Sequence, residues 1–329
     1  MKKESLLRKL TGSHELLLGV VLVVLCILVQ FKSPSFLTPT SIVDMLKNNA
    51  VTMILALGML CILLVGGMDI SIASTCALSG MTTGLLLKYH IVENAALLFL
   101  VATAIGLICG FIIGLIISKG KVLPIIATMG FMYIYRGLAY VISRNQWASA
   151  ADLGNFKTFA LKNILGINQV ILIVILCYVL FFFIMKWTPL GRKVYAVGSN
   201  PEAAAVSGIN TGRIKLMVYT VMGTLCGMCG ALAVSVYSSA QPNMMYGQEM
   251  DVIAACVIGG VSMNGGRGSV AGVLLGALTM AVINKALPLV GIDSIAQNTV
   301  QGVIIMTVII MNICMQRSMS KQNLKRREM

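Results

Sequence analysis

Long apolar runs alternate with short polar, Gly or Pro breaks along almost the whole chain. A helix that crosses a bilayer needs roughly 20 apolar residues, and most of these runs approach that length. The pattern predicts ten helical segments, at residues 15–31, 50–67, 71–88, 95–117, 122–142, 168–186, 214–236, 251–264, 269–288 and 297–316. The eighth segment is short and could be a half-helix or part of a re-entrant hairpin. We therefore expect an all-α, polytopic membrane protein with about ten (8–10) transmembrane helices.

Composition supports a membrane protein. The chain has 329 residues, of which 58% are hydrophobic and 11% charged, whereas a soluble domain carries about 25% charged residues. We expect a single membrane domain over residues 1–329 without a separate soluble module. The first apolar run follows Lys2, Lys3, Arg8 and Lys9, and no small-residue cleavage site comes after it. This run is therefore predicted to stay as an anchor rather than to be removed as a signal peptide.

The formal net charge of +14 could indicate nucleic-acid binding. However, the basic residues lie between apolar runs and at the chain ends, without the interleaved aromatics of a nucleic-acid surface. When the N-terminus is placed inside, the predicted interior loops receive Lys119 with Lys121, then the basic residues of 186–215, then Arg267. The positive-inside rule then predicts a multi-pass protein of the bacterial inner membrane with both termini cytoplasmic and no nucleic-acid partner.

No residue cluster in the sequence resembles a catalytic centre. The nine Cys lie in or beside apolar runs, where Cys behaves as a small hydrophobe. Glu249 and Asp251 are accompanied by no nucleophile, metal-ligand set or His. The stretch 265–268 lacks the Lys-Ser/Thr ending of a phosphate-binding loop. We expect no enzyme activity, no catalytic residue, no metal and no cofactor bound by this chain.

Two sequence patterns bear on helix packing. Gly recurs every four residues in two series, at 106, 110 and 114 and at 268, 272 and 276. Such stripes let helix backbones approach closely in lipid, and packing within one subunit is favoured over a dimer seam. The stretch 65–67 (Val-Gly-Gly) also recurs in outline at 258–260 (Ile-Gly-Gly), which suggests an internal duplication of the kind common in transporters.

The polar loop 187–213 contains the signal of a short helix. Ser199 or Asn200 can cap this helix, and Pro201 and Glu202 would occupy its first turn. Gly208 would follow its end. A capping side chain, Pro at the first position and an acid in the first turn all favour a helix start, and Gly can end it with positive φ. A short helix on such a loop can dock into a partner's groove. The alternative is a solvated connecting loop.

The same loop resembles the conserved cytoplasmic loop of ribose-type permease subunits of bacterial ABC sugar importers, whose pattern is T-x-x-G-R-x-x-Y-A-x-G-x-N-x-x-A-A-x-x-S-G-I. The matching residues are Thr188, Gly191, Arg192, Tyr195, Ala196, Gly198, Asn200, Ala203, Ala204, Ser207, Gly208 and Ile209. Residues 66–71, 124–130 and 249–272 are similar to three further family segments, so the resemblance covers nearly the whole chain. Departures at Met68, Ala73 and Met129 leave the family resemblance intact but argue against assigning one sugar.

The resemblance implies an ABC importer permease fold. It further implies a path formed by two such subunits, a separate cytoplasmic ATP-binding subunit that uses ATP and Mg, and an extracytoplasmic sugar-binding protein. The substrate would be a monosaccharide, either a ribose-like pentose or hexose or a sugar like autoinducer-2. The residues that couple the loop to the ATPase would be Gly191, Arg192, Asn200, Glu202, Ala203, Ala204 and Gly208.

For the translocation path or gate we predict Asp69, Ser71, Arg136, Glu249 and Asn264. Asp69 lies at membrane depth, where a charge suggests function, although it could also cap the next helix. Arg136 could extend to the outer interface or pair with Glu249. The rival function is an ion-coupled secondary transporter of a small polar solute. That mechanism would need an ion site built from intramembrane acids or broken helices, and only Asp69 approaches this requirement.

Overall fold

The computed structural model describes residues 14–164 and 166–293, together with 296, 299–300, 302–303, 306–307 and 310. The described part is almost entirely helical. Its helices are α2 (His14–Lys32), α3 (Pro39–Leu64), α4 (Ile72–Lys88), α5 (Ala95–Ser118), α6 (Pro124–Ser143), α7 (Gln169–Trp187), α8 (Pro189–Ser199), α9 (Pro201–Val206), α10 (Thr211–Tyr237), α11 (Gln248–Ile258) and α12 (Val270–Leu289). A 3₁₀ helix, η1 (Gly154–Leu161), precedes a small antiparallel hairpin of β1 (Asn163–Ile164) and β2 (Ile167–Asn168).

Within the described residues, seven helices are long and apolar enough to cross a membrane: α2, α3, α5, α6, α7, α10 and α12. Two further predicted segments correspond to shorter helices, α4 with 17 residues and α11 with 11. The tenth predicted segment, 297–316, falls largely outside the described residues. The polytopic helical fold is therefore confirmed, whereas the count of about ten spans is not.

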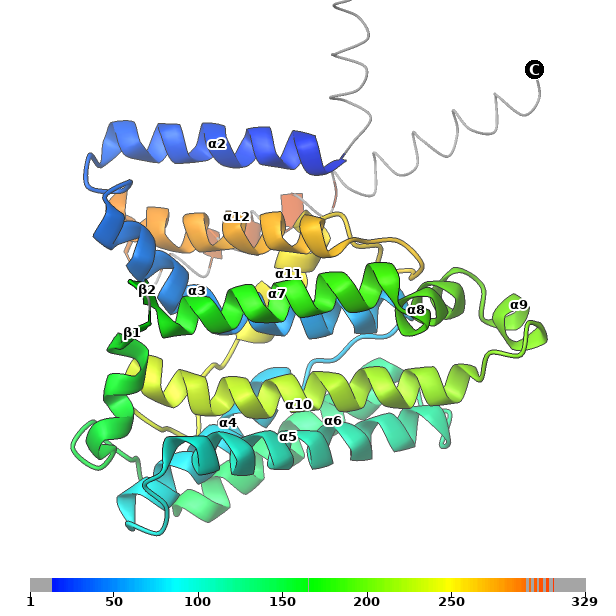
Figure 1. The fold of residues 1–329 in the computed structure, drawn as a ribbon, viewed down its shortest axis with the longest axis horizontal. Coiled ribbons are helices and arrows are strands. Elements are labelled where there is room, and N and C mark those ends of the chain that lie inside the picture. The colour runs from blue at the N-terminus through cyan, green and yellow to red at the C-terminus, as the bar shows by residue number, and fades with distance from the viewer. Residues whose placement is uncertain are drawn as a thin grey trace, which may run out of the picture.

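The long helices lie roughly side by side with the short helix α11 among them, and the other short elements lie at the two ends of the bundle (Figure 1). One end carries α8 and α9, and we call it the α9 end. The other end carries η1, β1 and β2, and we call it the hairpin end. α3 runs from the hairpin end toward the α9 end, whereas α10 and α12 run the opposite way.

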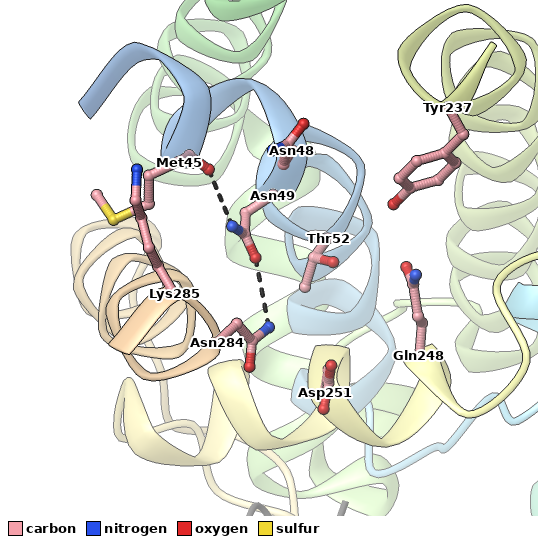
Figure 2. A pocket seen from close by; sticks show the side chains of 9 residues that line it. All are labelled: Met45, Asn48, Asn49, Thr52, Tyr237, Gln248, Asp251, Asn284 and Lys285. Atoms are coloured by element: carbon pink, nitrogen blue, oxygen red, sulfur yellow. Dashed lines mark hydrogen bonds between the residues drawn. The ribbon is translucent and has the colours of Figure 1, made fainter. Parts of the chain in front are cut away.

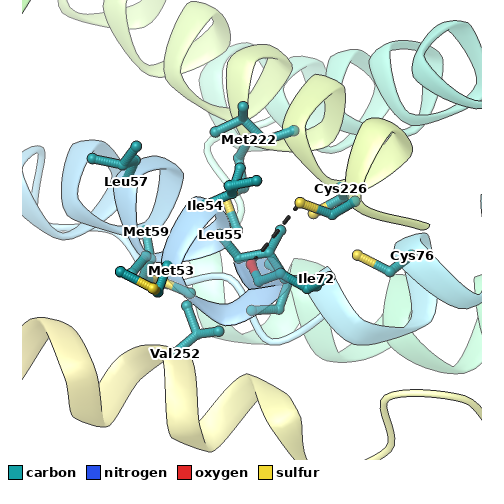
Figure 3. Packing of buried hydrophobic residues seen from close by; sticks show 14 of the residues in the cluster. Met53, Ile54, Leu55, Leu57, Met59, Ile72, Cys76, Met222, Cys226 and Val252 are labelled. Carbon is teal, nitrogen blue, oxygen red and sulfur yellow. Dashed lines mark hydrogen bonds between the residues drawn. The ribbon is translucent and has the colours of Figure 1, made fainter. Parts of the chain in front are cut away.

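The core is centred on α3, because every residue from Ala50 to Leu64 is buried. Helices α7, α10, α11 and α12 pack alongside α3, and the start of α4 adds side chains to the same cluster. Figure 3 shows side chains of α3, α4, α10 and α11 packed together, among them Ile54, Ile72, Met222 and Val252. This closely packed cluster around residues 54–64 of α3 separates the two ends of the bundle, and we call it the apolar plug.

The glycine stripes bring helices of the same chain into contact. A Cβ atom built on Gly106 of α5 would lie 2.2 Å from the Gly223 carbonyl oxygen of α10, and one on Gly223 would lie 2.3 Å from the Gly106 oxygen. In the second stripe, a Cβ on Gly276 would lie 2.0 Å from the Ala255 oxygen of α11. These distances leave room only for hydrogen, so the prediction of packing within one subunit is confirmed for these contacts.

Two helices end in the same way. At the end of α3, Gly66 N–H donates to the Leu63 oxygen and Gly67 N–H to the Ile62 oxygen, with Gly66 at φ +72°. At the end of α11, Gly260 and Val261 donate to the Val257 and Cys256 oxygens, with Gly260 at φ +82°. This is the two-bond glycine cap. The recurrence predicted from sequence is thus real as local geometry, but it matches 66 with 260 rather than with 259.

Several predicted boundaries were wrong for identifiable reasons. Helix α3 begins at Pro39 rather than at 50, since its first turns contain Asp44 and Asn48, polar residues that resemble a loop. Helix α11 ends at Ile258 rather than at 264, because the glycine cap stops it. Helix α8 was missed within the polar loop, although Pro189 occupies its first turn.

Candidate functional site

The predicted short helix of the loop 187–213 is present as α9. The Asn200 side-chain oxygen accepts from Ala203 N–H at 3.0 Å, and Gly208 ends the helix at φ +81°. Glu202 lies in the first turn and is exposed. The two alanines differ, because Ala203 is exposed while Ala204 is only 4% exposed and packs against its own chain. The outward surface of α9 therefore lacks Ala204 and includes Val206, which is 91% exposed and which the sequence analysis missed.

Helix α8 connects α9 to the end of α3 and to the segment 259–269. A Cβ on Gly198 would lie 1.6 Å from the Leu64 carbonyl oxygen at the end of α3. The same oxygen accepts from Gly266 N–H at 2.9 Å, and Tyr195 donates its hydroxyl to the Gly268 oxygen at 2.9 Å. The end of α8 thus touches both α3 and the segment 259–269 that joins α11 to α12.

The remaining predicted residues of this loop divide between buried and exposed positions. Gly191 is buried, and a Cβ there would lie 2.3 Å from the Met185 oxygen of α7, so it allows α8 to fold back closely. Arg192 is exposed at the α9 end. Asn264, predicted for the path, is also exposed there and lines a 340 Å³ pocket with Gly198, Ser199, Ser262, Gly265, Gly266 and Arg267.

Asp69 and Ser71 form one buried turn ahead of α4. The Asp69 Oδ1 atom accepts from the Ser71 N–H at 2.8 Å and from the Ser71 hydroxyl at 2.6 Å. The neighbouring Met68 carbonyl accepts from the Tyr219 hydroxyl of α10 at 3.1 Å. Asp69 therefore fixes the turn that precedes α4, but the cap position belongs to Ser71 and no side chain caps the first turn of the helix. A role of either residue in the path stays a prediction.

Arg136 of α6 holds the segment 238–247, which joins α10 to α11. Its Nη1 atom donates to the Pro242 and Met244 carbonyl oxygens at 2.8 and 2.9 Å. Its guanidinium carbon lies 6.0 Å from the centre of the Tyr246 ring, within range of a cation–π contact. The direct ion pairs among the described residues are Lys47–Asp44 and His90–Glu93. Arg136 therefore forms no direct salt bridge with Glu249, and its hydrogen bonds go to backbone carbonyls instead. A longer-range charge contact between the two side chains stays a prediction.

A polar cavity lies among α3, α10, α11 and α12, on the hairpin side of the apolar plug. It has a volume of about 310 Å³ and is lined by Met45, Asn48, Asn49, Thr52, Tyr237, Gln248, Asp251, Asn284 and Lys285. Figure 2 shows these side chains arriving from all four helices. None of the residues predicted for the path lines it. The signal that could have found it is a set of polar side chains inside apolar segments, which are costly there unless they serve a function.

The chain is similar to permease components of known transport systems. Residues 41–311 match the family model described as branched-chain amino acid transport system / permease component. The chain is 35% identical over 293 residues to the ribose import permease protein of Bacillus subtilis (strain 168), covering 88% of this chain and 90% of that one.

Two further relatives have a similar extent. The galactose/methyl galactoside import permease protein of Escherichia coli (strain K12) is 35% identical, with 87% of this chain and 90% of that one covered. The L-arabinose ABC transporter permease protein of Azospirillum brasilense is 31% identical, with 89% and 86% covered. No solved structure matches the chain.

Proposed function

Because the chain belongs to the family of branched-chain amino acid transport system permease components, we propose that it is the membrane-spanning permease subunit of an ATP-driven importer for a monosaccharide. Its curated relatives are named for ribose, galactose and arabinose, which favours a sugar over an amino acid. Like them, it is a transport subunit rather than an enzyme. ATP hydrolysis would belong to a separate cytoplasmic subunit, and an extracytoplasmic binding protein would deliver the sugar to a pair of permease subunits.

The charge distribution supports a cytoplasmic position for the α9 end. This end carries a set of basic residues from three connections and the helix turns beside them: Lys119, Lys121, Lys186, Arg192, Lys193, Arg213, Lys215 and Arg267. The hairpin end mixes basic residues with Asp44, Glu93 and Asp152. Under the positive-inside rule the α9 end faces the cytoplasm, and α2, which begins there, leads outward (Figure 1).

The observation that carries the proposal is the capped helix α9 at this basic end. It presents Glu202, Ala203 and Val206 outward while Ala204 anchors it to the chain. Through α8 it connects to the end of α3 and to the segment 259–269 that joins α11 to α12. Such an arrangement is suited to passing motion from an ATPase to α3 and to the segment 259–269, as alternating access requires.

Variants of the outward surface test this role. Ala203→Trp should obstruct a groove that accepts a small side chain, Glu202→Lys reverses the charge offered to the partner, and Gly208→Val resists the positive φ. We expect all three to insert normally and to lose sugar uptake and permease-stimulated ATP hydrolysis together. Glu202→Asp keeps the charge and serves as the matched control, with near wild-type transport.

The measurement is uptake and ATP hydrolysis by proteoliposomes that contain the permease, the ATP-binding subunit and the binding protein. Both rates are divided by the amount of permease in the membrane, which removes any difference in insertion. Wild-type rates in Ala203→Trp and Glu202→Lys would show that α9 is merely a connector and would remove the basis of the proposed coupling.

A further inference from the structure

The polar cavity is unusual because of its composition as well as its position. Eight of its nine lining side chains carry hydrogen-bonding groups, although most residues of the four helices are apolar. Asp251 and Lys285 give it one acid and one base, and the rest are neutral. Carboxamides and hydroxyls both donate and accept hydrogen bonds. This lining fits a neutral solute that carries many hydroxyl groups.

Part of the lining is already engaged within the chain. Asn49 donates to the Met45 carbonyl at 2.9 Å and its oxygen faces the Asn284 amide at 3.4 Å (Figure 2). Lys285 Nζ donates to the Ser41 carbonyl, so its charge is directed to the backbone and not into the cavity. These contacts fix one wall of the cavity.

The opposite wall holds one buried acceptor atom that lacks a partner. Among the described residues the Gln248 Oε1 atom is buried and accepts no hydrogen bond. Such an atom costs free energy unless a ligand or water satisfies it. Gln248 is the first residue of α11, and Figure 2 shows Asn48, Thr52 and the Tyr237 hydroxyl across the same space.

The depth of the cavity also suits a solute on its way through the bundle. Asn48 is exposed at its mouth, and one turn further along α3 Thr52 is only 7% exposed. Beyond Thr52, Ile54 and Leu55 are fully buried in the apolar plug of Figure 3. A solute from the hairpin end could therefore reach Thr52 but not the α9 end.

On the basis of the proposed function, we propose that this cavity is the sugar-binding site of the permease subunit. Asn48, Thr52 and Gln248 hydrogen-bond the hydroxyl groups, and the ring of Tyr237 offers an apolar face to the C–H surface of the sugar. Its volume of about 310 Å³ is at the small end of the range for ligand pockets, about 300–1,000 Å³, as a single monosaccharide requires. Opening of the apolar plug, which lies between Thr52 and the α9 end, would then release the sugar toward the α9 end.

A labelling experiment on the permease alone tests the site without relying on transport. The thiol introduced by Asn48→Cys should react with a charged methanethiosulfonate reagent from the hairpin side. D-ribose, D-galactose or L-arabinose should slow that reaction, whereas L-leucine should not. Gln146→Cys, exposed at the hairpin end outside the cavity, provides a thiol that should react without sugar protection, and the wild-type chain measures the background.

Transport variants provide the second test. Asn48→Leu and Gln248→Met keep approximate size but remove hydrogen-bonding groups, and Gln146→Met is the matched control. In proteoliposomes with both partner proteins, we expect sugar uptake per ATP hydrolysed to fall about three- to tenfold per lost hydrogen bond, while ATP hydrolysis continues. This separates the cavity from the α9 variants, in which both rates fall together.

The outcomes distinguish this inference from the proposed function. Sugar uptake by the wild type, with no sugar protection of the Asn48→Cys thiol and normal uptake by both cavity variants, would overturn the site and leave the proposed function standing. Sugar protection of the Asn48→Cys thiol without ATP-driven uptake by the wild type would support the binding site and overturn the proposed function. Protection by L-leucine alone would contradict both a sugar site and a sugar importer.

Discussion

A methyl group at Gly198 would enter the space that the Leu64 carbonyl oxygen occupies. The Cβ atom of alanine would lie 1.6 Å from that oxygen and 2.7 Å from the Gly266 nitrogen. An ordinary contact needs about 3.5 Å, so α8 and the end of α3 would have to separate by about 2 Å. The substitution Gly198→Ala therefore breaks the junction of α8 with α3 while it leaves the membrane-crossing helices unchanged.

The expected cost follows from two effects. Overpacking of a close contact costs about 1–3 kcal/mol. The separation also strains the bond from Gly266 N–H to the Leu64 oxygen, now 2.9 Å, and a net hydrogen bond contributes about 1 kcal/mol. The sum, about 2–4 kcal/mol, is local to the junction, so we expect moderate loss of stability and severe loss of coupling.

The assay compares Gly198→Ala with Gly130→Ala, since a Cβ on Gly130 of α6 meets nothing within 4 Å. Thermal unfolding in detergent is followed by a thiol-reactive dye, because Cys61, Cys76, Cys226, Cys229 and Cys256 are buried until the bundle opens. Uptake and ATP hydrolysis are measured per inserted permease. A Gly198→Ala protein with wild-type unfolding and wild-type uptake would refute the proposed junction between α8 and α3.

Three further predictions concern other parts of the bundle. Gly106→Leu should lower the unfolding temperature and the amount of inserted protein, since a Cβ there already meets the α10 backbone at 2.2 Å; unchanged unfolding would contradict the close α5–α10 packing. Arg136→Ala should reduce uptake more than Arg136→Lys, because lysine can still donate to the Pro242 and Met244 carbonyls; equal uptake by both variants and wild type would show that the anchor is dispensable. Reporter fusions within 187–213 should report cytoplasm and a fusion near Asp152 should report exterior, and a cytoplasmic signal at Asp152 would refute the orientation.

The sequence pattern predicts the helices that consist of one continuous apolar run and the short helix that is fixed by local signals. Helices α5, α7, α10 and α12 lie within a few residues of the predicted segments, because a continuous apolar run has few alternatives in lipid. Helix α9 was predicted from its cap, its proline and Gly208, each of which acts locally. Ala204 shows the limit of that reasoning, because its burial depends on the rest of the chain.

Features assembled from distant segments were not predictable in this way. The polar cavity takes one to four residues from each of four helices, and no single segment reveals it. The sequence pattern predicts a loop at Asn48 because nearby Asp44 and Lys47 are charged, although all three residues lie on α3. Arg136 and Glu249 carry opposite charges near the same region, yet carbonyl oxygens of 238–247 already satisfy the arginine. Charge alone therefore could not identify the groups that Arg136 contacts directly.

The most direct test of the account is sugar uptake by proteoliposomes of defined composition. With the permease, the ATP-binding subunit and the sugar-loaded binding protein, we expect uptake that requires hydrolysable ATP on the α9 side of the membrane. Omission of the ATP-binding subunit should abolish it. Uptake by the permease alone, driven by an imposed proton or sodium gradient and indifferent to ATP, would contradict the account and identify an ion-coupled secondary transporter instead.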